Sequence, residues 1–473
     1  MIKKTKIVAT IGPVTTSVEM LSKLLKEGMN IVRLNFSHGD FNEHQEKVNN
    51  FRKAIVLTGI SGAIMQDLSG PKIRLGEFYQ ERVLLKAGDT ITITTEKIIG
   101  DEKNVSINYP MFAKEVKKGD KIMVDDGKKK FEVISINGNK VLCKILVGGE
   151  TKGRRGVNLP DSDISVSSLT DKDKKDIEFG IKNKVDFFAF SFVRKPEDVV
   201  ELREILNKKK SKSKIIAKIE TPQAVNNIDA ILELCDGLMV ARGDLAIEVP
   251  AEKVPMIQKM LIKKCNDAGK IVITATQMLE SMIKSPVPTR AEVSDIANAI
   301  IDGTDAIMLS EETTLGDYPI EAVKIMTKVA LDIESNFPER EISHLDQKGD
   351  IGVTDSITGS IVKTAHNIGA KAIIALTKTG FTARMISRYK PVPFIIAVTS
   401  EEITFRQLNA SFGCLPLKVE NYSTALDKEV FKSVRDFCIK EKIASKGDKV
   451  VIATCSQWDK KGGPTNMIMV ETL

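Results

Sequence analysis

Eight short apolar segments recur between residues 6 and 311, and most of them are continuous hydrophobic strings rather than alternating ones. Such strings are typical of strands that are buried on both faces, as in a parallel sheet. Amphipathic helical patterns fill most of the intervals between them. The predicted strands are Lys6–Gly12, Ile31–Ser37, Gly62–Leu68, Asp186–Phe192, Lys214–Glu220, Gly237–Gly243, Lys270–Thr276 and Asp305–Glu311.

The order of these segments predicts the fold of the larger part of the chain. Eight strands, most of them followed by a helix, are typical of an α/β protein with a (β/α)8 TIM barrel. The strands recur at regular intervals except between the third and the fourth, where more than a hundred residues intervene. We therefore predict a catalytic barrel from residues 1–71 and 166–338, interrupted after its third strand.

The interrupting segment, residues 72–165, has a different pattern. Its β-rich runs are separated by turn signals such as Asp126-Gly127 and Asn137-Gly138. This pattern predicts an inserted all-β barrel domain that sits as a lid on the rim of the larger barrel. The predicted strands are Thr90–Glu96, Lys121–Val124, Lys130–Ile136 and Lys140–Val147.

After a polar linker near residues 338–350, alternating strands and helices resume. This alternation predicts a C-terminal α/β regulatory domain over residues 350–473 with a five-stranded sheet. Its predicted strands are Ala372–Thr377, Phe394–Thr399, Cys414–Val419, Lys449–Thr454 and Asn466–Glu471.

Composition narrows the class of protein. The formal charge of +7 is spread along the chain, so we expect no nucleic-acid partner. No apolar run reaches the length of a membrane span, and the first strand begins too early to leave room for a signal peptide. The six cysteines are scattered without a C-x-x-C motif. We expect a cytoplasmic protein without disulfides.

Polar residues stand at the ends of seven of the eight predicted strands. In a TIM barrel these ends meet at one face, where active sites lie. Any one of these residues is best explained as a helix or turn cap, but their convergence predicts an active site. They are Arg33, Asn35, Ser37, Asp67, Ser191, Lys218, Glu220, Arg242, Asp244, Thr276 and Glu311.

Lys218, Glu220 and Asp244 carry the clearest chemical signal. Lys218 and Glu220 lie two apart on one strand and would face the same way, which on its own is equally typical of a structural ion pair. Asp244 follows the next strand and supplies a second carboxylate. Two carboxylates suit Mg²⁺ or Mn²⁺, and a lysine beside them can neutralise a phosphoryl group in transfer. No P-loop and no dinucleotide-binding glycine motif occurs.

At these residues the sequence resembles the pyruvate kinase family, and the resemblance extends from about residue 3 to the C-terminus. The matching motifs are TKIVATIGP from Thr5, MNIVRLNFSHG from Met29, IIAKIE from Ile215, GLMVARGDL from Gly237 and ATQMLESM from Ala275. The resemblance implies transfer of the phosphoryl group of phosphoenolpyruvate to ADP, giving pyruvate and ATP. It also implies a homotetramer and the bacterial form of the family that lacks an extra C-terminal domain.

The resemblance also implies roles for individual residues. The catalytic residues would be Arg33, Lys218 and Thr276, with Thr276 delivering a proton. Glu220 and Asp244 would hold the divalent metal. The substrate-binding set would be Arg33, Ser191, Lys218, Gly243, Asp244 and Thr276. The nucleotide phosphates would face His38, Arg74 and Arg155, where Arg155 stands in place of a lysine that the family often has.

A further implication concerns K⁺. Family members that depend on K⁺ typically carry glutamate at the position of Lys72, whereas the K⁺-independent branch carries lysine there, commonly with apolar residues at Leu68 and Leu75. The resemblance therefore implies that K⁺ is not required. An ammonium group can supply the same unit charge as a monovalent cation. The pocket would be formed by Asn35, Ser37, Asp67 and Leu68.

One turn in the C-terminal domain suggests regulation. Its hydroxyls and backbone N–H groups precede a helix and could bind a phosphate, although an ordinary βα turn explains them equally well. The resemblance favours a phosphorylated allosteric effector. The turn contains Thr377, Lys378, Thr379, Gly380 and Thr382, and Lys460, Lys461, Gly462 and Gly463 could complete the site.

Two other functions fit parts of the pattern. A Mg²⁺-dependent barrel enzyme that handles phosphoenolpyruvate or pyruvate, such as a lyase or carboxylase, would use a similar carboxylate site without ADP. A catalytically dead relative could act as a binding protein, but it would be expected to lack Lys218, Glu220 or Asp244.

Overall fold

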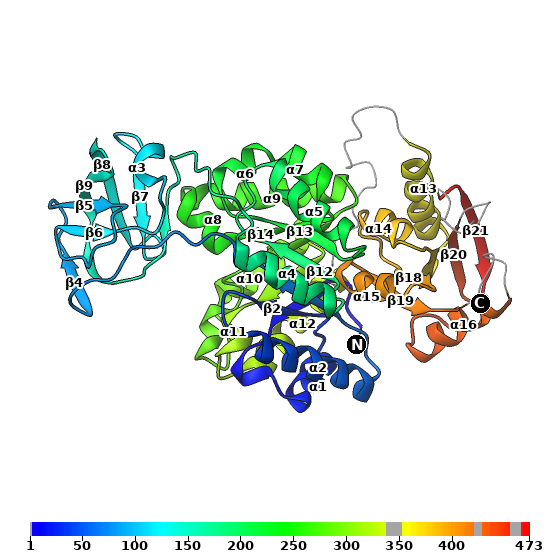
Figure 1. The fold of residues 1–473 in the computed structure, drawn as a ribbon. Helices are drawn as coiled ribbons and strands as arrows, with labels where there is room; N and C mark the ends of the chain where they lie inside the picture. Colours follow the sequence, from blue (N-terminus) through cyan, green and yellow to red (C-terminus); the bar gives the residue numbers. More distant parts are fainter. Residues whose placement is uncertain (1, 337–351, 421–427, 455–464) are drawn as a thin grey trace.

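The computed structural model describes residues 2–336, 352–420, 428–454 and 465–473. The chain forms three parts in a row, with the inserted β-rich domain at one end, a barrel in the centre and the C-terminal domain at the other end (Figure 1). Each part has a hydrophobic core of its own. Within the described residues, no helix is long and apolar enough to cross a lipid bilayer.

The central part is a closed barrel of eight parallel strands, as predicted. Almost every residue of these strands is buried, which explains their continuous apolar strings. One apolar cluster fills the inside of the barrel and another lies between the strands and the surrounding helices. Around the barrel the strands follow the order β1 (Lys6–Thr10), β16 (Ala306–Leu309), β15 (Ile271–Ala275), β14 (Gly237–Ala241), β13 (Lys214–Ile219), β12 (Phe187–Phe190), β3 (Ala63–Asp67) and β2 (Ile31–Asn35).

The predicted strands extend one or two residues beyond most of the observed ends. Phe192 and Thr276, for example, have positive φ angles of 55° and 70°, so the chain has left the ladder before them. Arg242 and Gly243 were expected in a strand, but they begin the short helix α8 (Arg242–Glu248). Ser191, Glu220 and Thr276 therefore lie in the βα turns at the rim of the barrel, whereas Arg33, Asp67 and Lys218 lie in the last residues of their strands.

The helices that follow the barrel strands begin with recognisable caps. Thr170 and Asp173 form a reciprocal capping box at α4, and Thr289 and Glu292 form another at α10. The helical segment after β13 is divided at Asn227 into two short helices. The principal helices are α1 (Val18–Lys26), α2 (Phe41–Thr58), α4 (Asp171–Lys182), α5 (Pro196–Lys208), α6 (Pro222–Asn226), α7 (Ile228–Leu234), α9 (Val254–Asp267), α10 (Arg290–Asp302), α11 (Glu311–Thr314) and α12 (Pro319–Asn336).

The inserted domain is formed mainly of β-strands, as predicted. Its ladders form an open six-stranded sheet and a separate two-stranded sheet of β10 (Gly149–Lys152) and β4 (Arg82–Leu85). Single bridges from Arg74 to Gly156 and from Leu75 to Ile107 replace a closing strand. The domain also holds a short helix, α3 (Phe112–Glu115). The larger sheet has the order β11 (Val157–Asn158), β7 (Lys121–Val124), β8 (Lys129–Asn137), β9 (Lys140–Val147), β5 (Thr90–Thr94) and β6 (Asn104–Ser106).

The C-terminal domain contains the predicted five-stranded sheet. Four of its strands are parallel, and β21 (Met467–Thr472) pairs antiparallel with β20 (Lys449–Thr454). The other strands are β19 (Cys414–Lys418), β18 (Phe394–Thr399) and β17 (Ala372–Leu376). The helices are α13 (Val353–Asn367), α14 (Phe381–Ser387), α15 (Glu402–Gln407) and α16 (Lys428–Lys440).

Two buried ion pairs join the C-terminal domain to the bottom of the barrel. Lys390 Nζ lies 2.7 Å from Asp305, and Arg406 Nε lies 2.8 Å from Asp186. Because both carboxylates are buried, each needs its cation to offset the loss of water. These contacts seat the domain on the face opposite to the polar strand ends.

Candidate active site

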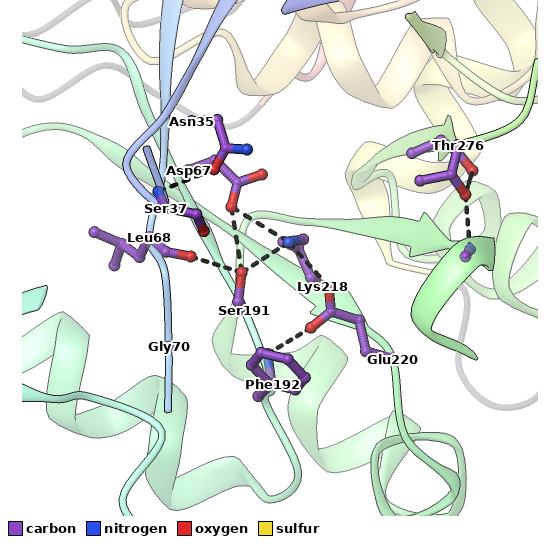
Figure 2. Close-up of polar contacts among 12 residues, drawn as sticks. Asn35, Ser37, Asp67, Leu68, Gly70, Ser191, Phe192, Lys218, Glu220 and Thr276 are labelled. Carbon is purple, nitrogen blue, oxygen red and sulfur yellow. Dashed lines mark hydrogen bonds and ion pairs between the residues drawn. The ribbon is translucent and has the colours of Figure 1, made fainter. Parts of the chain in front are cut away.

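Lys218 is the centre of the polar cluster at the top of the barrel. Its Nζ lies 2.7 Å from the Ser191 hydroxyl, 3.3 Å from Asp67 and 2.9 Å from Glu220. Figure 2 shows the ammonium group between these three side chains, which come from neighbouring strands. Burial alone would lower the pKa of Lys218, but Asp67 and Glu220 outweigh it and raise the pKa. The ammonium group is therefore charged and fixed in place.

Arg33 and Asp67 form a second buried ion pair beside Lys218. Arg33 Nε donates to Asp67 at 2.6 Å, and another guanidinium nitrogen donates to Thr10 at 2.9 Å. Burial raises the pKa of Asp67, but Arg33 and Lys218 outweigh it and lower the pKa. Asp67 thus carries a full negative charge that orients both cations.

The residues of the predicted K⁺ pocket lie around Asp67, as Figure 2 shows. The Asn35 side chain accepts the backbone N–H of Ser37 at 3.1 Å, and Leu68 is buried with its carbonyl accepting the Ser191 hydroxyl at 2.6 Å. The side chain of Lys72 reaches solvent at the rim, but its ammonium group is partly buried; this partial burial, Arg74 and Lys218 lower its pKa, while Asp244 and Asp67 raise it. Its charge therefore acts within the same polar cluster.

Glu220 and Asp244 supply two carboxylates on adjacent βα turns. Glu220 is almost fully buried; its Oε2 accepts the backbone N–H of Phe192 at 2.7 Å, and its Oε1 lies 2.9 Å from Lys218 Nζ. Burial raises the pKa of Glu220 to about 7, with repulsion from Asp244 adding to the shift and Lys218 opposing it. Two neighbouring carboxylates that repel each other fit a divalent cation.

No cluster of three or more His, Cys, Asp or Glu side chains suitable for a metal occurs in the part of the chain that the structure describes. A cation held by Glu220 and Asp244 would therefore complete its coordination with water or substrate oxygens. Mg²⁺ is commonly bound in this way, by one or two carboxylates and substrate phosphates.

Thr276 lies apart from Lys218 and is held in an unusual backbone conformation. Its φ of 70° is rare for a β-branched residue and costs on the order of 1–3 kcal/mol. The hydroxyl donates to the Ala275 carbonyl at 2.6 Å and accepts the Gly243 N–H at 2.7 Å. Arg242, itself paired with Asp295 at 2.7 Å, donates to the Thr276 carbonyl at 2.6 Å. Arg242 therefore acts as a positioning residue, a role that the strand-end pattern alone does not reveal.

A cleft of about 740 Å³ opens between the barrel and the inserted domain. It brings together His38, Lys72, Arg74, Arg155 and Asp244, which were predicted from four separate segments of the sequence. Burial lowers the pKa of His38, and the charges of Lys72 and Arg74 lower it further. The cleft is thus a basic surface facing an acidic one, as a nucleotide phosphate with a metal requires.

The residues of the cleft that were missed from the sequence include Asn158, Arg194 and Glu248. The Asn158 amide donates to Glu248 at 2.7 Å and so joins the inserted domain to α8. Burial raises the pKa of Glu248 to about 7, and Asp244 adds to the shift. Glu248 follows Asp244 by one helical turn, so the i, i+4 spacing could have placed it on the same face.

The predicted effector turn joins β17 to α14 in the C-terminal domain. The Thr382 hydroxyl is hydrogen-bonded to that of Thr465 at 2.8 Å, and the Thr404 hydroxyl donates to the Lys378 carbonyl at 2.6 Å. Gly380 caps α14 with a φ of 78°. Lys460, Lys461, Gly462 and Gly463, which were expected to complete this site, lie outside the described residues.

Known proteins resemble this chain along its whole length. The family described as "Pyruvate kinase, barrel domain" matches residues 2–323, and "Pyruvate kinase, alpha/beta domain" matches residues 355–471. A pyruvate kinase from Bacillus licheniformis is 44% identical over 475 residues, covering 99% of this chain and 80% of that protein. One from Clostridium perfringens is 43% identical over 477 residues and is covered completely. The solved structure of a pyruvate kinase from Cryptosporidium parvum matches with a TM-score of 0.95 and 37% identity, covering 99% and 96% of the two chains.

Proposed function

The chain belongs to the pyruvate kinase family and transfers the phosphoryl group of phosphoenolpyruvate to ADP, and we propose that Lys218 is the cation on which this transfer depends. One observation supports the proposal above the others. The Lys218 ammonium group is held within 3.3 Å of Ser191, Asp67 and Glu220. A charge that is oriented before the reaction needs no reorganisation when the transition state forms.

The reaction divides into two steps that this chain's residues would serve. In the first, the bond between phosphorus and the enol oxygen breaks while a bond to the terminal oxygen of ADP forms, with Arg33 and Lys218 beside the phosphoryl oxygens. In the second, the enolate of pyruvate takes a proton at its terminal carbon, which the Thr276 hydroxyl would deliver. Gly243, Asp244 and Thr276 form the turn that would bind the substrate carboxylate.

Glu220 and Asp244 would hold Mg²⁺ or Mn²⁺. The metal would neutralise negative charge on the substrate and nucleotide oxygens. Ser191 would keep Lys218 directed at the phosphoryl group, and His38, Arg74 and Arg155 would face the nucleotide phosphates. The intact set of Lys218, Glu220 and Asp244 argues against a catalytically dead relative, and family membership against a lyase or carboxylase.

K⁺ independence is the sharpest test of the proposed site. Lys72 interacts electrostatically with Asp67 and Asp244, so its ammonium group can supply the charge that K⁺ would bring. Leu75 does not support this idea directly, because it is buried in the core of the inserted domain. We expect near-full activity in tetramethylammonium buffer without K⁺, and K⁺ dependence in Lys72→Glu. Lys86→Glu, on the exposed surface of the inserted domain, is the control. Strong activation of the unmodified enzyme by K⁺ would contradict the proposal.

The remaining proposals concern the whole molecule. The domain limits at residues 71, 72, 165, 166 and 350 stay predictions, as do the homotetramer and a phosphorylated effector at the Thr377–Thr382 turn. The five cysteines that the structure describes are buried free thiols, which supports a cytoplasmic enzyme. Size-exclusion chromatography with light scattering tests the tetramer.

A further inference from the structure

A second polar cavity lies on the opposite side of the barrel from the active site, at the seam with the C-terminal domain. It has a volume of about 450 Å³. Its walls come from the N-terminal ends of β13 and β14 and from α14 and α15. It meets the predicted effector turn only at Lys378 and Thr379. The cavity is therefore separate from the catalytic cleft, and its other lining residues lie outside the predicted effector turn.

The lining of this cavity is strongly basic. It contains five basic side chains and two carboxylates, which are Arg203, Lys212, Lys214, Lys378 and Arg384 against Asp236 and Glu401. Both carboxylates are already engaged at the rim. Arg203 lies 2.6 Å from Asp236, and Lys212 lies 3.1 Å from Glu401. The lining thus has more positive charge than its own carboxylates neutralise.

Lys214 and Arg384 hold the uncompensated charge. Among the described residues, no carboxylate oxygen lies within 4 Å of the charged nitrogens of either side chain, and Arg384 donates only to the Thr379 carbonyl at 3.0 Å. Burial and the nearby charge of Arg384 together lower the pKa of Lys214 to about 7. Two cations that face one cavity and raise each other's cost of burial are stabilised when an anion binds between them.

We propose that this interdomain cavity binds a small phosphorylated molecule through Lys214 and Arg384. A phosphate dianion matches two adjacent cations, and the guanidinium group can donate two parallel hydrogen bonds to it. Polar groups of Ser211, Thr379 and Thr404 also line the cavity. The volume lies within the range of roughly 300–1,000 Å³ that small-molecule sites occupy, so a sugar or nucleoside attached to the phosphate fits as well.

Occupation of the cavity would fasten the two domains together. Lys214 is the first residue of β13, the strand that carries Lys218, whereas Arg384 belongs to α14 of the C-terminal domain. Next to the cavity the Gln407 amide already bridges the same seam, donating to the carbonyls of Lys212 at 2.9 Å and Asp186 at 3.2 Å. A bound phosphate would add an ionic bridge to this hydrogen-bonded one.

Calorimetric titration of the full-length enzyme tests the site with inorganic phosphate, ribose 5-phosphate and AMP, without substrates. We expect at least one of them to bind, and Lys214→Met to weaken that binding by about 10-fold or more, since a hydrogen bond to a charged group is lost. Arg384→Gln should act in the same direction. Lys182→Met, an exposed lysine of α4, is the matched control and should bind as the unmodified enzyme does.

The three probes distinguish the source of the phosphate. Tight binding of inorganic phosphate alone would mean that the site recognises only the phosphate group. Tighter binding of ribose 5-phosphate or AMP would mean that the rest of the cavity contacts the attached sugar or nucleoside. At pH 8, binding should be accompanied by proton uptake, because an anion raises the pKa of Lys214. Failure of all three probes to bind would overturn the proposal. So would binding that survives in both Lys214→Met and Arg384→Gln but is lost in Thr382→Val, because the phosphate would then lie in the turn.

Discussion

Replacing Lys218 with methionine tests the proposed centre of catalysis and the stability of its surroundings together. Methionine retains the length and apolar stem of the side chain but removes the ammonium group that lies 2.7 Å from Ser191 and 2.9 Å from Glu220. Loss of one oriented donor typically lowers a catalytic rate on the order of 10²–10³-fold, and loss of a full charge can lower it further. We therefore expect kcat for ATP formation to fall by at least that factor.

The same substitution should destabilise the protein. Breaking a buried ion pair costs about 3–5 kcal/mol. Asp67 keeps its 2.6 Å contact with Arg33, so the principal unpaired group is Glu220, and we expect the lower end of that range. At roughly 2–4 °C per kcal/mol for a domain of this size, the melting temperature of the barrel should fall by about 6–12 °C.

The loss of stability should depend on pH in a defined direction. Burial already raises the pKa of Glu220 to about 7, and without Lys218 that pKa rises further. A carboxyl group whose folded pKa lies above its unfolded value favours folding at low pH, and this contribution is lost as the pH rises through the folded pKa. The difference in melting temperature between Lys218→Met and the unmodified enzyme should therefore be smaller at pH 5.5 than at pH 8.

Two measurements complete this test. A coupled assay of ATP formation gives kcat, and melting followed by circular dichroism from pH 5.5 to 8.5 gives stability, with Lys182→Met as the control. Retention of most of kcat in Lys218→Met would refute the catalytic assignment. A destabilisation that does not change with pH would refute the assignment of Glu220 as the group left unpaired.

Three further substitutions test other parts of the structure. Thr276→Val keeps the shape of the side chain and removes its hydroxyl, so the enzyme should exchange the methyl protons of pyruvate about 10²-fold more slowly or worse, as followed by NMR. Thr276→Ser keeps a hydroxyl and should catalyse this exchange at a rate close to that of the unmodified enzyme. Equal rates in the Val and Ser variants would exclude Thr276 from proton delivery. Arg406→Ala leaves the buried Asp186 carboxylate, whose pKa burial raises to about 6, without its cation. The free energy of unfolding should fall by about 3 kcal/mol at pH 8 and by less at pH 5, where the carboxyl group is protonated. Equal losses at both pH values would contradict this. Asn158→Ala removes the 2.7 Å hydrogen bond between the inserted domain and Glu248 and should raise KM for ADP by about 10-fold. Asn139→Ala, at the far end of that domain, should leave KM unchanged. An unchanged KM in both variants would show that the contact does not help to close the cleft.

The eight barrel strands and most polar residues of the active site were predictable from the sequence. A strand that is buried on both faces must be apolar along its length, so its position can be located from the residues of that segment alone. Because parallel strands carry their C-terminal ends to one rim, Lys218, Glu220 and Thr276 could be assigned to one face without knowledge of any contact. The resemblance in these same motifs then led to the family, and the comparisons confirm it.

Contacts between distant segments were not predictable in this way. Lys218 and Asp67 are 151 residues apart, and their 3.3 Å separation depends on the order of β13, β12 and β3 in the closed barrel. The family pattern that linked an apolar residue at Leu75 to K⁺ independence could not reveal that this side chain is buried in the inserted domain. In the same way, single bridges rather than a full strand link the edges of the inserted sheet. The hydrophobic periodicity of the sequence does not predict this pairing.

The tertiary structure alone decided which charges lack a partner. Periodicity and propensity report on neighbours within a few residues, whereas the burial of a charge and the distance to its counter-charge depend on how separate domains pack. Lys214 reads in the sequence as the polar start of a strand, and Arg384 as an ordinary helical residue. Only the seam between the barrel and the C-terminal domain brings these two cations to one cavity, because their positions follow from the docking of α14 and α15 beneath β13.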